Sequence, residues 1–335
     1  MLPGELPLLA FLEPIAADLA NTQHVKEIVI NRPGEVGIET HGWEWRSVPE
    51  FTAERMDQIS ILACQMAGKD FDQEHPIGTA TLPGRKRFTS LRDPATHQGC
   101  PAITIRVPHV DERDIFDADF LDMTANTNKG GSRKAQVTNE LLALYRERSW
   151  PHFCDIAVRS KKTILGIGKT GKGKTSLIRR LSRRIPLHER VVTIEDTDEY
   201  GEMLQQNRVS VFYGSPHVSA LDGMEVSLRL RPDRIIMQEL RGPEAFVFLR
   251  AEMAGHGGGM TTLHADMDEL SADACFDALE MMAAGHDHAK KMEPEKLRKL
   301  IRKHVDIIIA CDRDDVTDAF DLPWVWFRDA EEARA

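Results

Sequence analysis

The 335-residue chain is long for a single hydrophobic core, so its length predicts two domains. Hydrophobic residues make up 41% and charged residues 29% of the chain, the balance of an ordinary globular protein rather than of a disordered or membrane-embedded one. The formal net charge of -10 disfavours a general nucleic-acid binder, because such a protein must neutralise phosphates. We therefore expect no direct, sequence-specific binding of nucleic acid.

The sequence carries no predicted membrane or export segment. No apolar run approaches the roughly 20 residues that cross a bilayer, and Met1–Ala20 lacks the basic start and cleavage site of a signal peptide. The five cysteines are scattered without a CxxC pair, which indicates neither a zinc site nor a disulfide framework. We expect a cytoplasmic protein with reduced thiols.

Short helices and strands alternate irregularly through the first hundred residues. The apolar patterns predict helices at Leu6–Asn21 and Ala53–Ala67. They predict strands at Glu27–Asn31, Val36–Glu39, Trp43–Arg46, Arg87–Leu91 and Ala102–Val107. These elements indicate a small α+β domain over residues 1–110.

The composition changes after residue 110, where Asp, Asn, Lys and Gly dominate and predict a linker over 111–135. Helices are predicted at Gln136–Arg148 and Pro151–Arg159. Short apolar strands then alternate with helices, at Thr163–Ile167, Val191–Ile194, Val209–Phe212, Arg234–Met237, Met260–Leu263 and Val305–Ala310. Such strands favour a sheet buried on both faces, so residues 136–335 are predicted to form an α/β domain.

The segment Gly168–Thr175 matches the phosphate-loop pattern G-x-x-x-x-G-K-[ST], between an apolar strand and an amphipathic helix, Lys174–Ile185. Its glycines let backbone N–H groups surround a phosphate chain, and the following helix adds the positive end of its dipole. Lys174 would reach the β- and γ-phosphates, and the Thr175 hydroxyl would ligate Mg²⁺. The expected nucleotide-binding residues are Gly168, Thr170, Gly171, Lys172, Gly173, Lys174, Thr175 and Ser176. ATP and Mg²⁺ are the expected ligands.

Two acidic clusters end predicted strands, and in a parallel sheet such ends face the ligand site. The first is Ile194–Glu199, and the second ends at Glu239. Glu239 is the preferred candidate for orienting the attacking water, because it ends the more apolar strand. Glu195 or Glu199 could share that role, and Glu195 could hold Mg²⁺ through water.

A glycine-rich segment, Gly255–Ala265, leads into a strand that ends at His264. An imidazole beside a γ-phosphate can sense its charge or donate a hydrogen bond to it. The glycines and the position at a strand end favour a nucleotide-linked role for His264 over a structural one.

These motifs, in this order, resemble those of the secretion traffic ATPases. Within that superfamily the chain is most similar to the VirB-type ATPases of type IV secretion and conjugation systems, through Thr104–Arg106, Arg231–Ile236 and Glu239–Gly242. Two features depart from the pattern. Gln238 stands where the family usually has glycine, and Lys169 and Lys172 stand where small residues are common.

The resemblance implies a RecA-like P-loop domain behind a PAS-like N-terminal domain, and ATP hydrolysis by a homohexameric ring. It implies docking to inner-membrane components at the cytoplasmic face, with a secreted protein or a DNA–protein complex as the transported substrate. Arg106, then Arg87, are the upstream arginines expected to reach the phosphates. An arginine there would stabilise charge on the transferring phosphoryl group.

Three alternatives share the phosphate loop. A pilus-type extension or retraction motor would carry the same nucleotide motifs and differ in its partner. A nucleotide-gated binding module would bind ATP with negligible hydrolysis, although two acidic clusters argue against it. A small-molecule kinase would need an acceptor pocket that the sequence does not indicate.

Overall fold

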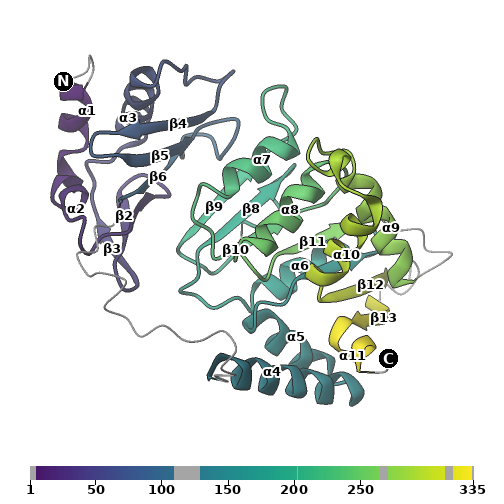
Figure 1. Ribbon diagram of the computed structural model, residues 1–335. Coiled ribbons are helices and arrows are strands. Elements are labelled where there is room, and N and C mark those ends of the chain that lie inside the picture. Colours follow the sequence, from purple (N-terminus) through teal and green to yellow (C-terminus); the bar gives the residue numbers. More distant parts are fainter. Residues whose placement is uncertain (1–4, 109–128, 202, 265–270, 314–319, 334–335) are drawn as a thin grey trace. The chain divides into compact units, whose positions relative to one another are not determined.

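The computed structural model describes residues 5–108, 129–201, 203–264, 271–313 and 320–333. The described residues form two separate β-sheets, one of six strands in the N-terminal part and one of seven strands in the C-terminal part (Figure 1). The predicted combination of a small α+β domain with a larger α/β domain is confirmed. Among the helices described, none is long and apolar enough to cross a membrane.

The N-terminal sheet is antiparallel, in the strand order β3-β2-β1-β6-β5-β4. In chain order the strands are β1 (Glu27–Ile30), β2 (Glu35–Glu39), β3 (Trp43–Ser47), β4 (Ile77–Leu82), β5 (Lys86–Leu91) and β6 (Ala102–Arg106). Every predicted strand of this part is present. Residues 83–85 join β4 to β5, with Gly84 and Arg85 both at positive φ.

The N-terminal helices are α1 (Glu5–Phe11), a short 3-10 helix (Glu13–Ile15), α2 (Ala16–Ala20) and α3 (Ala53–Met66). The prediction of one continuous helix over Leu6–Asn21 is therefore wrong. Pro14 lacks an N–H group and its ring clashes with the preceding turn, so the helix ends at Phe11. The core between helices and sheet includes Leu8, Ile15, Ile28, Phe51, Met56, Ile59, Phe88 and Ile105.

The second sheet has the strand order β13-β12-β7-β11-β10-β8-β9. Its strands are β7 (Ile164–Ile167), β8 (Val191–Glu195), β9 (Arg208–Phe212), β10 (Arg234–Met237), β11 (Met260–Leu263), β12 (Ile307–Arg313) and β13 (Phe320–Phe327). Strands β10, β11, β7 and β12 run parallel to one another. All residues of β7, β8, β10 and β11 are buried, as the apolar runs predicted.

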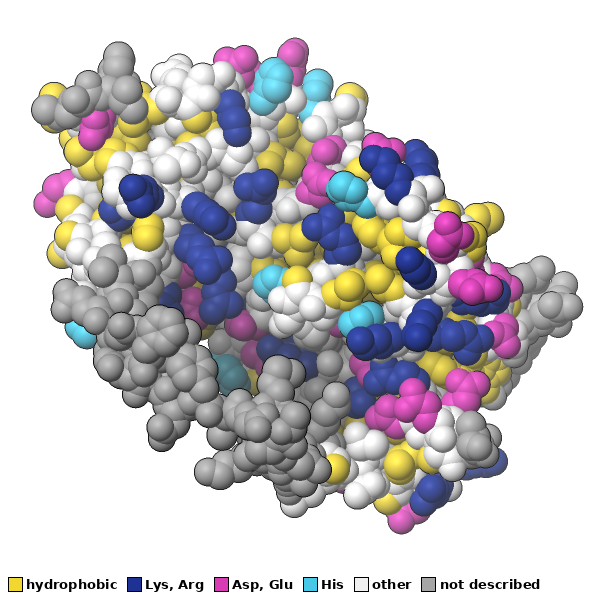
Figure 2. Space-filling model, in the orientation of Figure 1, with side chains coloured by type: hydrophobic (Ala, Val, Ile, Leu, Met, Phe, Trp, Pro, Cys, Tyr) yellow, Lys and Arg dark blue, Asp and Glu magenta, His cyan; other side chains and the backbone are white. Residues whose placement is uncertain are grey.

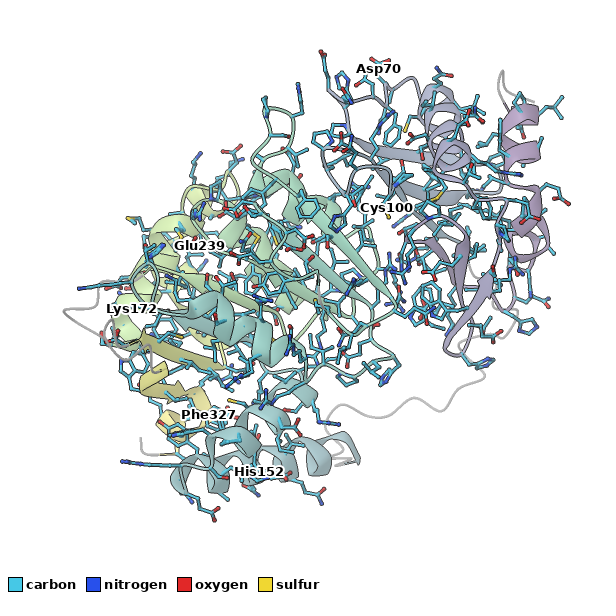
Figure 3. The ribbon with its side chains drawn as sticks, turned by 180° about the vertical axis from the view of Figure 1, so that it is seen from behind. Asp70, Cys100, His152, Lys172, Glu239 and Phe327 are labelled. Atoms are coloured by element: carbon cyan, nitrogen blue, oxygen red, sulfur yellow. The ribbon has the colours of Figure 1, made fainter. Side chains whose placement is uncertain are left out.

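Helices lie on both faces of this sheet. They are α4 (Lys129–Arg146), α5 (Trp150–Arg159), α6 (Lys174–Ser182), α7 (Ala220–Ser227), α8 (Glu244–Met253), α9 (Ala272–Ala283), α10 (Pro294–His304) and α11 (Arg328–Glu332). The chain moves one way along the sheet through α6 and the opposite way through α8, so right-handed crossovers put these helices on opposite faces. Figure 1 shows α8 in front of the sheet, and Figure 3, from behind, shows α6 in front.

Two expectations for this part of the chain differ from the structure, namely the start of one helix and the absence of a C-terminal strand. Helix α4 begins at Lys129 rather than at Gln136, so the end of the predicted linker is helical, since glycines are tolerated near a helix start. The rest of that linker, residues 111–128, lies outside the described residues. Strand β13 was missed because Pro323 interrupts its pattern, and an edge strand can carry proline.

Ion pairs cover the surface of α9 and α10. Arg298 pairs with Asp277, and Arg302 pairs with Asp273. Figure 2 shows dark blue and magenta side chains next to one another on the face of the molecule that carries these two helices. Exposed pairs of this kind contribute at most about 1 kcal/mol each, so α10 depends mainly on its buried Leu297 and Ile301.

The chain divides into two compact units that cut across the sequence. The first comprises Met1–Asp119, Arg190–Thr197 and Gln206–Pro232, and the second comprises Phe120–Glu189, Asp198–Gln205 and Asp233–Ala335. The phosphate loop, Glu239 and His264 all belong to the second unit.

Buried charges secure the amino ends of β10 and β11 in the second unit. Arg234 is fully buried and donates to Glu189 at 2.5 Å, to the carbonyl of Val158 at 2.6 Å and to that of Gly258 at 3.3 Å. A Cβ atom at Gly258 would lie 2.1 Å from the Arg234 guanidinium, and φ there is +85°. Position 258 therefore requires glycine, because a larger residue would clash with the Arg234 side chain.

Glu252 of α8 ties the same end of the sheet together. Its carboxylate accepts hydrogen bonds from the Thr163 hydroxyl at 2.5 Å and from the N–H groups of Gly258 and Gly259 at 3.1 and 2.9 Å. Burial raises the pKa of Glu252 to about 7, in opposition to these three hydrogen bonds. A proton is thus held more tightly by the folded protein than by the unfolded chain.

Replacing this carboxyl tests that shift. Because the folded pKa lies above the unfolded value of 4.5, the free energy of unfolding contributed by Glu252 falls as pH rises from about 4.5 to about 7. Glu252→Gln cannot titrate, so we expect it to gain up to about 3 kcal/mol relative to the parent across this window. Urea unfolding of both proteins at each end of the window measures this difference.

The comparison cancels other titrating groups, including Glu27, whose pKa burial also raises to about 7. A parent-to-variant difference that stays constant with pH would contradict the assignment of the raised pKa to Glu252.

Candidate nucleotide site

The phosphate loop is shaped by three glycines with positive φ. Gly168 follows β7 with φ +151°, Gly171 has φ +79°, and Gly173 has φ +90° at the start of α6. A Cβ atom at Gly168 would lie 2.5 Å from the carbonyl oxygen of Cys311, whereas one at Gly171 would meet no atom within 4 Å. Gly168 is therefore required by close packing, and Gly171 and Gly173 by their backbone conformation.

Lys174 is the first residue of α6, and its side chain turns back over the loop. It is 8% exposed, and its ammonium donates to the carbonyls of Gly168 at 2.8 Å and Lys169 at 3.0 Å. Burial lowers the pKa of Lys174, and the nearby Glu239 carboxylate opposes that shift. The ammonium is thus placed where the loop would receive phosphate oxygens.

His264 lies between Lys174 and Glu239. Its Nδ1 atom is 3.3 Å from the Lys174 ammonium, and its Nε2 atom is 2.6 Å from Oε1 of Glu239. An imidazole with its proton on Nε2 suits both neighbours, because Nδ1 then accepts and Nε2 faces the carboxylate. The second contact is close but is not aligned as a hydrogen bond, since Oε1 accepts none from the described residues.

Glu239 follows β10 and is 8% exposed. Its second oxygen, Oε2, accepts from two nitrogens of Arg241, Nε at 2.9 Å and Nη2 at 2.5 Å. Lys174, His264, Glu239 and Arg241 therefore form one continuous chain of polar contacts. Figure 3 labels Glu239 and the loop residue Lys172 toward the same edge of the sheet. These contacts bring Lys174, Glu239 and His264 together, and Glu239 faces the phosphate loop as expected, whereas the roles of the three residues toward a nucleotide stay predictions.

A cleft of about 440 Å³ opens beside the loop. It is lined by Thr175, Ser176, Arg179, Asp198, Glu199 and Gly201. The predicted Mg²⁺ ligand Thr175 thus shares a cleft with the predicted acid Glu199. No group of three or more His, Cys, Asp or Glu side chains able to hold a metal occurs among the described residues. The Thr175 hydroxyl and the Glu199 carboxylate nevertheless suit Mg²⁺, because this ion commonly binds one or two protein oxygens together with substrate phosphates and water.

The remaining acids of the first cluster differ in exposure. Glu195 is fully buried at the end of β8 and accepts a hydrogen bond from the Thr193 hydroxyl, whereas Asp196 and Asp198 are exposed. Glu195 belongs to the first unit and the loop to the second. Its role as a water-mediated Mg²⁺ ligand therefore stays a prediction.

The two candidate arginines are neighbours on the N-terminal sheet. Arg87 of β5 pairs directly with Arg106 of β6, and both side chains are exposed. Opposed like charges repel, which suits a pair that would receive an anion. Both lie in the first unit, so their approach to the phosphates stays a prediction.

The unusual residues of the motifs have structural partners. The Lys172 ammonium lies 3.3 Å from the Asp312 carboxylate, so part of the extra charge in the loop is balanced by that acid. Lys169 and Thr170 are exposed. Gln238 is 7% exposed, and its main-chain carbonyl accepts a hydrogen bond from the Thr262 hydroxyl at 2.7 Å.

The glycine run before β11 serves packing rather than the nucleotide. Gly258 and Gly259 lie at the amino end of β11, next to Arg234, Glu252 and Phe248, whereas His264 follows the carboxyl end of that strand. Contrary to the prediction, these glycines therefore do not support a nucleotide-linked role for His264. The position of His264 supports that role by itself. Ala265, the last residue of the segment, lies outside the described residues.

Two residues of the site were missed from the sequence, Arg241 and Glu244. Glu244, in the first turn of α8, accepts from the N–H groups of Arg241 at 2.7 Å and Gly242 at 2.8 Å. Their closeness to Glu239 along the chain was the available signal. A turn that brings position 241 back onto position 239 could not be read from residue types alone.

Comparisons with known proteins agree with this geometry. The family described as "Type II/IV secretion system protein" matches residues 132–311. The chain is 34% identical over 299 residues to the type IV secretion system protein PtlH homologue of Bordetella bronchiseptica, covering 87% of this chain and 86% of that protein. It is 32% identical over 323 residues to VirB11 of Bartonella henselae, covering 91% and 89% of the two chains.

The chain belongs to the type II/IV secretion family of ATPases. The crystal structure of the VirB11 ATPase from the Brucella suis type IV secretion system, in complex with sulphate, is similar over 99% of this chain and 98% of that chain. The TM-score is 0.86 at 28% identity. The predicted VirB-type resemblance and the two-domain, RecA-like P-loop fold are confirmed.

For this family member, the close packing at Gly168 yields a testable expectation. Gly168→Ala forces the loop away from Cys311, so we expect affinity for a fluorescent ATP analogue to fall by about a hundredfold or more. Gly171→Ala is the matched control, because it adds backbone strain of about 1–2 kcal/mol without a clash, about a tenfold loss. Equal losses in the two variants would show that the contact with Cys311 does not shape the loop.

Proposed function

We propose that the protein hydrolyses ATP to ADP and phosphate with Mg²⁺, as the ring-shaped motor of a type IV secretion or conjugation machine. The observation that carries this proposal is the contact chain from Lys174 through His264 to Glu239, beside a phosphate loop. These contacts support the proposal because one imidazole touches both the Lys174 ammonium and the buried Glu239 carboxylate.

Each residue has a defined role in this proposal. The backbone N–H groups of the loop and the start of α6 bind the phosphates, and Lys174 stabilises negative charge on the transferring group. The Thr175 hydroxyl would hold Mg²⁺, which when bound neutralises charge on the β- and γ-phosphates. Glu239 orients the attacking water, with help from Glu195 or Glu199.

His264 would report on the phosphates in this scheme. The Lys174 ammonium now faces Nδ1 of His264 and two backbone carbonyls. A γ-phosphate that draws Lys174 toward itself would change the contact at Nδ1, and the imidazole also touches Glu239. Occupancy of the loop would thereby alter the surroundings of the water-orienting carboxylate.

The remaining parts of the proposal rest on family likeness. They are a homohexamer, domains at 1–110 and 136–335 joined by a linker at 111–135, and Arg106 and Arg87 as phosphate ligands. Loss of the γ-phosphate would loosen the domains and do mechanical work on the machine. We infer a cytoplasmic location, with docking to inner-membrane components and a secreted protein or DNA–protein complex as substrate.

Removing the phosphate-loop lysine tests the enzymatic core of this proposal. We expect Lys174→Ala to lower Mg²⁺-dependent phosphate release at least a hundredfold, because it removes the ammonium that turns back over the loop and would stabilise charge on the phosphates. Circular dichroism and the melting temperature should stay close to those of the parent. Lys169→Ala, which removes an exposed lysine from the same loop, should stay within about threefold of the parent.

Normal turnover by a folded Lys174→Ala protein would contradict the assigned role.

Mass photometry of the parent with ATP and Mg²⁺ should give a particle of about six subunits. Tight ATP binding without turnover or a ring would favour a nucleotide-gated binding module instead.

A further inference from the structure

The carboxylate of Glu239 has a charged partner on its solvent side. Nε and Nη2 of Arg241 both donate to Oε2, at 2.9 and 2.5 Å, and the opposite oxygen faces His264. The Glu239 side chain is 10% exposed, whereas that of Arg241 is 59% exposed. The arginine therefore covers the carboxylate from outside and fixes one of its two oxygens.

The turn that carries Arg241 is itself held in place. Oε1 of Glu244 accepts the N–H groups of both Arg241 and Gly242, and Glu244 is 3% exposed. A Cβ atom at Gly242 would lie 3.1 Å from Oε2 of Glu244, so the turn packs tightly on this carboxylate. Glu244 thus holds the backbone of Arg241 in the position from which its side chain contacts Glu239.

We propose that Arg241 is a positioning residue for Glu239, an inference that rests on the proposed role of Glu239 in orienting water. A water-orienting carboxylate must keep its orientation while the substrate binds. Two N–H donors on Oε2 restrict its rotation. The other oxygen then keeps a constant direction in the site.

This role differs measurably from direct contact with the nucleotide. An arginine that bound phosphate would raise KM and weaken ATP affinity when removed. An arginine that acts through Glu239 would lower kcat and leave ATP affinity nearly unchanged. The two cases separate in steady-state kinetics together with equilibrium binding of a fluorescent ATP analogue.

The experiment compares Arg241→Ala and Arg241→Lys with the parent. We expect Arg241→Ala to lower kcat about 10- to 100-fold, the cost of a misplaced catalytic group, with KM and ATP affinity within about threefold. Arg241→Lys should recover part of kcat, because an ammonium supplies the charge and one donor. Arg250→Ala, which removes an exposed arginine from α8, is the control for charge and should behave like the parent.

A double-mutant cycle tests whether Arg241 acts through Glu239. Single-turnover hydrolysis of radiolabelled ATP would be measured for Glu239→Gln with and without Arg241→Ala. We expect the second substitution to cost less than about threefold once the carboxylate is gone. Equal losses in both backgrounds, or a loss of ATP affinity in Arg241→Ala, would overturn the inference.

The same set separates this inference from the proposed function. A parent without turnover, or Glu239→Gln as active as the parent, would refute the role of Glu239 itself. An inactive Glu239→Gln protein beside a fully active Arg241→Ala protein would refute the role of Arg241 alone. Melting temperatures of all variants identify any loss that comes from unfolding.

Discussion

The Lys174 ammonium is the interaction on which the rest of the site depends. It donates hydrogen bonds to the carbonyls of Gly168 and Lys169, which tie the start of α6 to the beginning of the phosphate loop. Its contact with His264 links the loop to the end of β11. From there the contacts continue to Glu239 and Arg241. A positive charge that is 8% exposed needs such partners, because burial without them would neutralise it.

The parallel strands separate chemistry from stability within the second unit. The phosphate loop, Glu239 and His264 follow the carboxyl ends of β7, β10 and β11. The amino ends of β10 and β11 are held by Arg234 with Glu189 and by Glu252 with the backbone of Gly258 and Gly259. Groups that bind a substrate and groups that hold the sheet together thus occupy opposite edges, so each set can change with limited effect on the other.

The sequence predicted the features that local rules determine. Apolar runs located the strands around the loop, and the spacing of Gly168, Gly173 and Lys174 identified the loop itself. Pro14 and Pro323 produced two errors, because the effect of a proline depends on whether it breaks a helix or lies in an edge strand.

Tertiary contacts explain what the sequence could not predict. The run Gly255–Gly259 looked functional because glycine suits phosphate binding, but the close approach of Arg234 requires one of these glycines. The contact of Arg241 with Glu239 and the part played by Glu244 could not be predicted, because both depend on a turn that returns the chain to Glu239. The pairing of Arg87 with Arg106 likewise follows from strand register, which residue types do not reveal.

The proposed hydrolysis depends most directly on the carboxylate of Glu239. The decisive measurement is steady-state phosphate release with Mg²⁺ and ATP, for the parent and for Glu239→Gln, with ATP affinity measured on both. We expect turnover by the parent, and at least a hundredfold slower turnover by a variant that binds ATP as tightly as the parent does. Equal turnover by the two proteins would contradict the role of Glu239, because the water would then be oriented by another group.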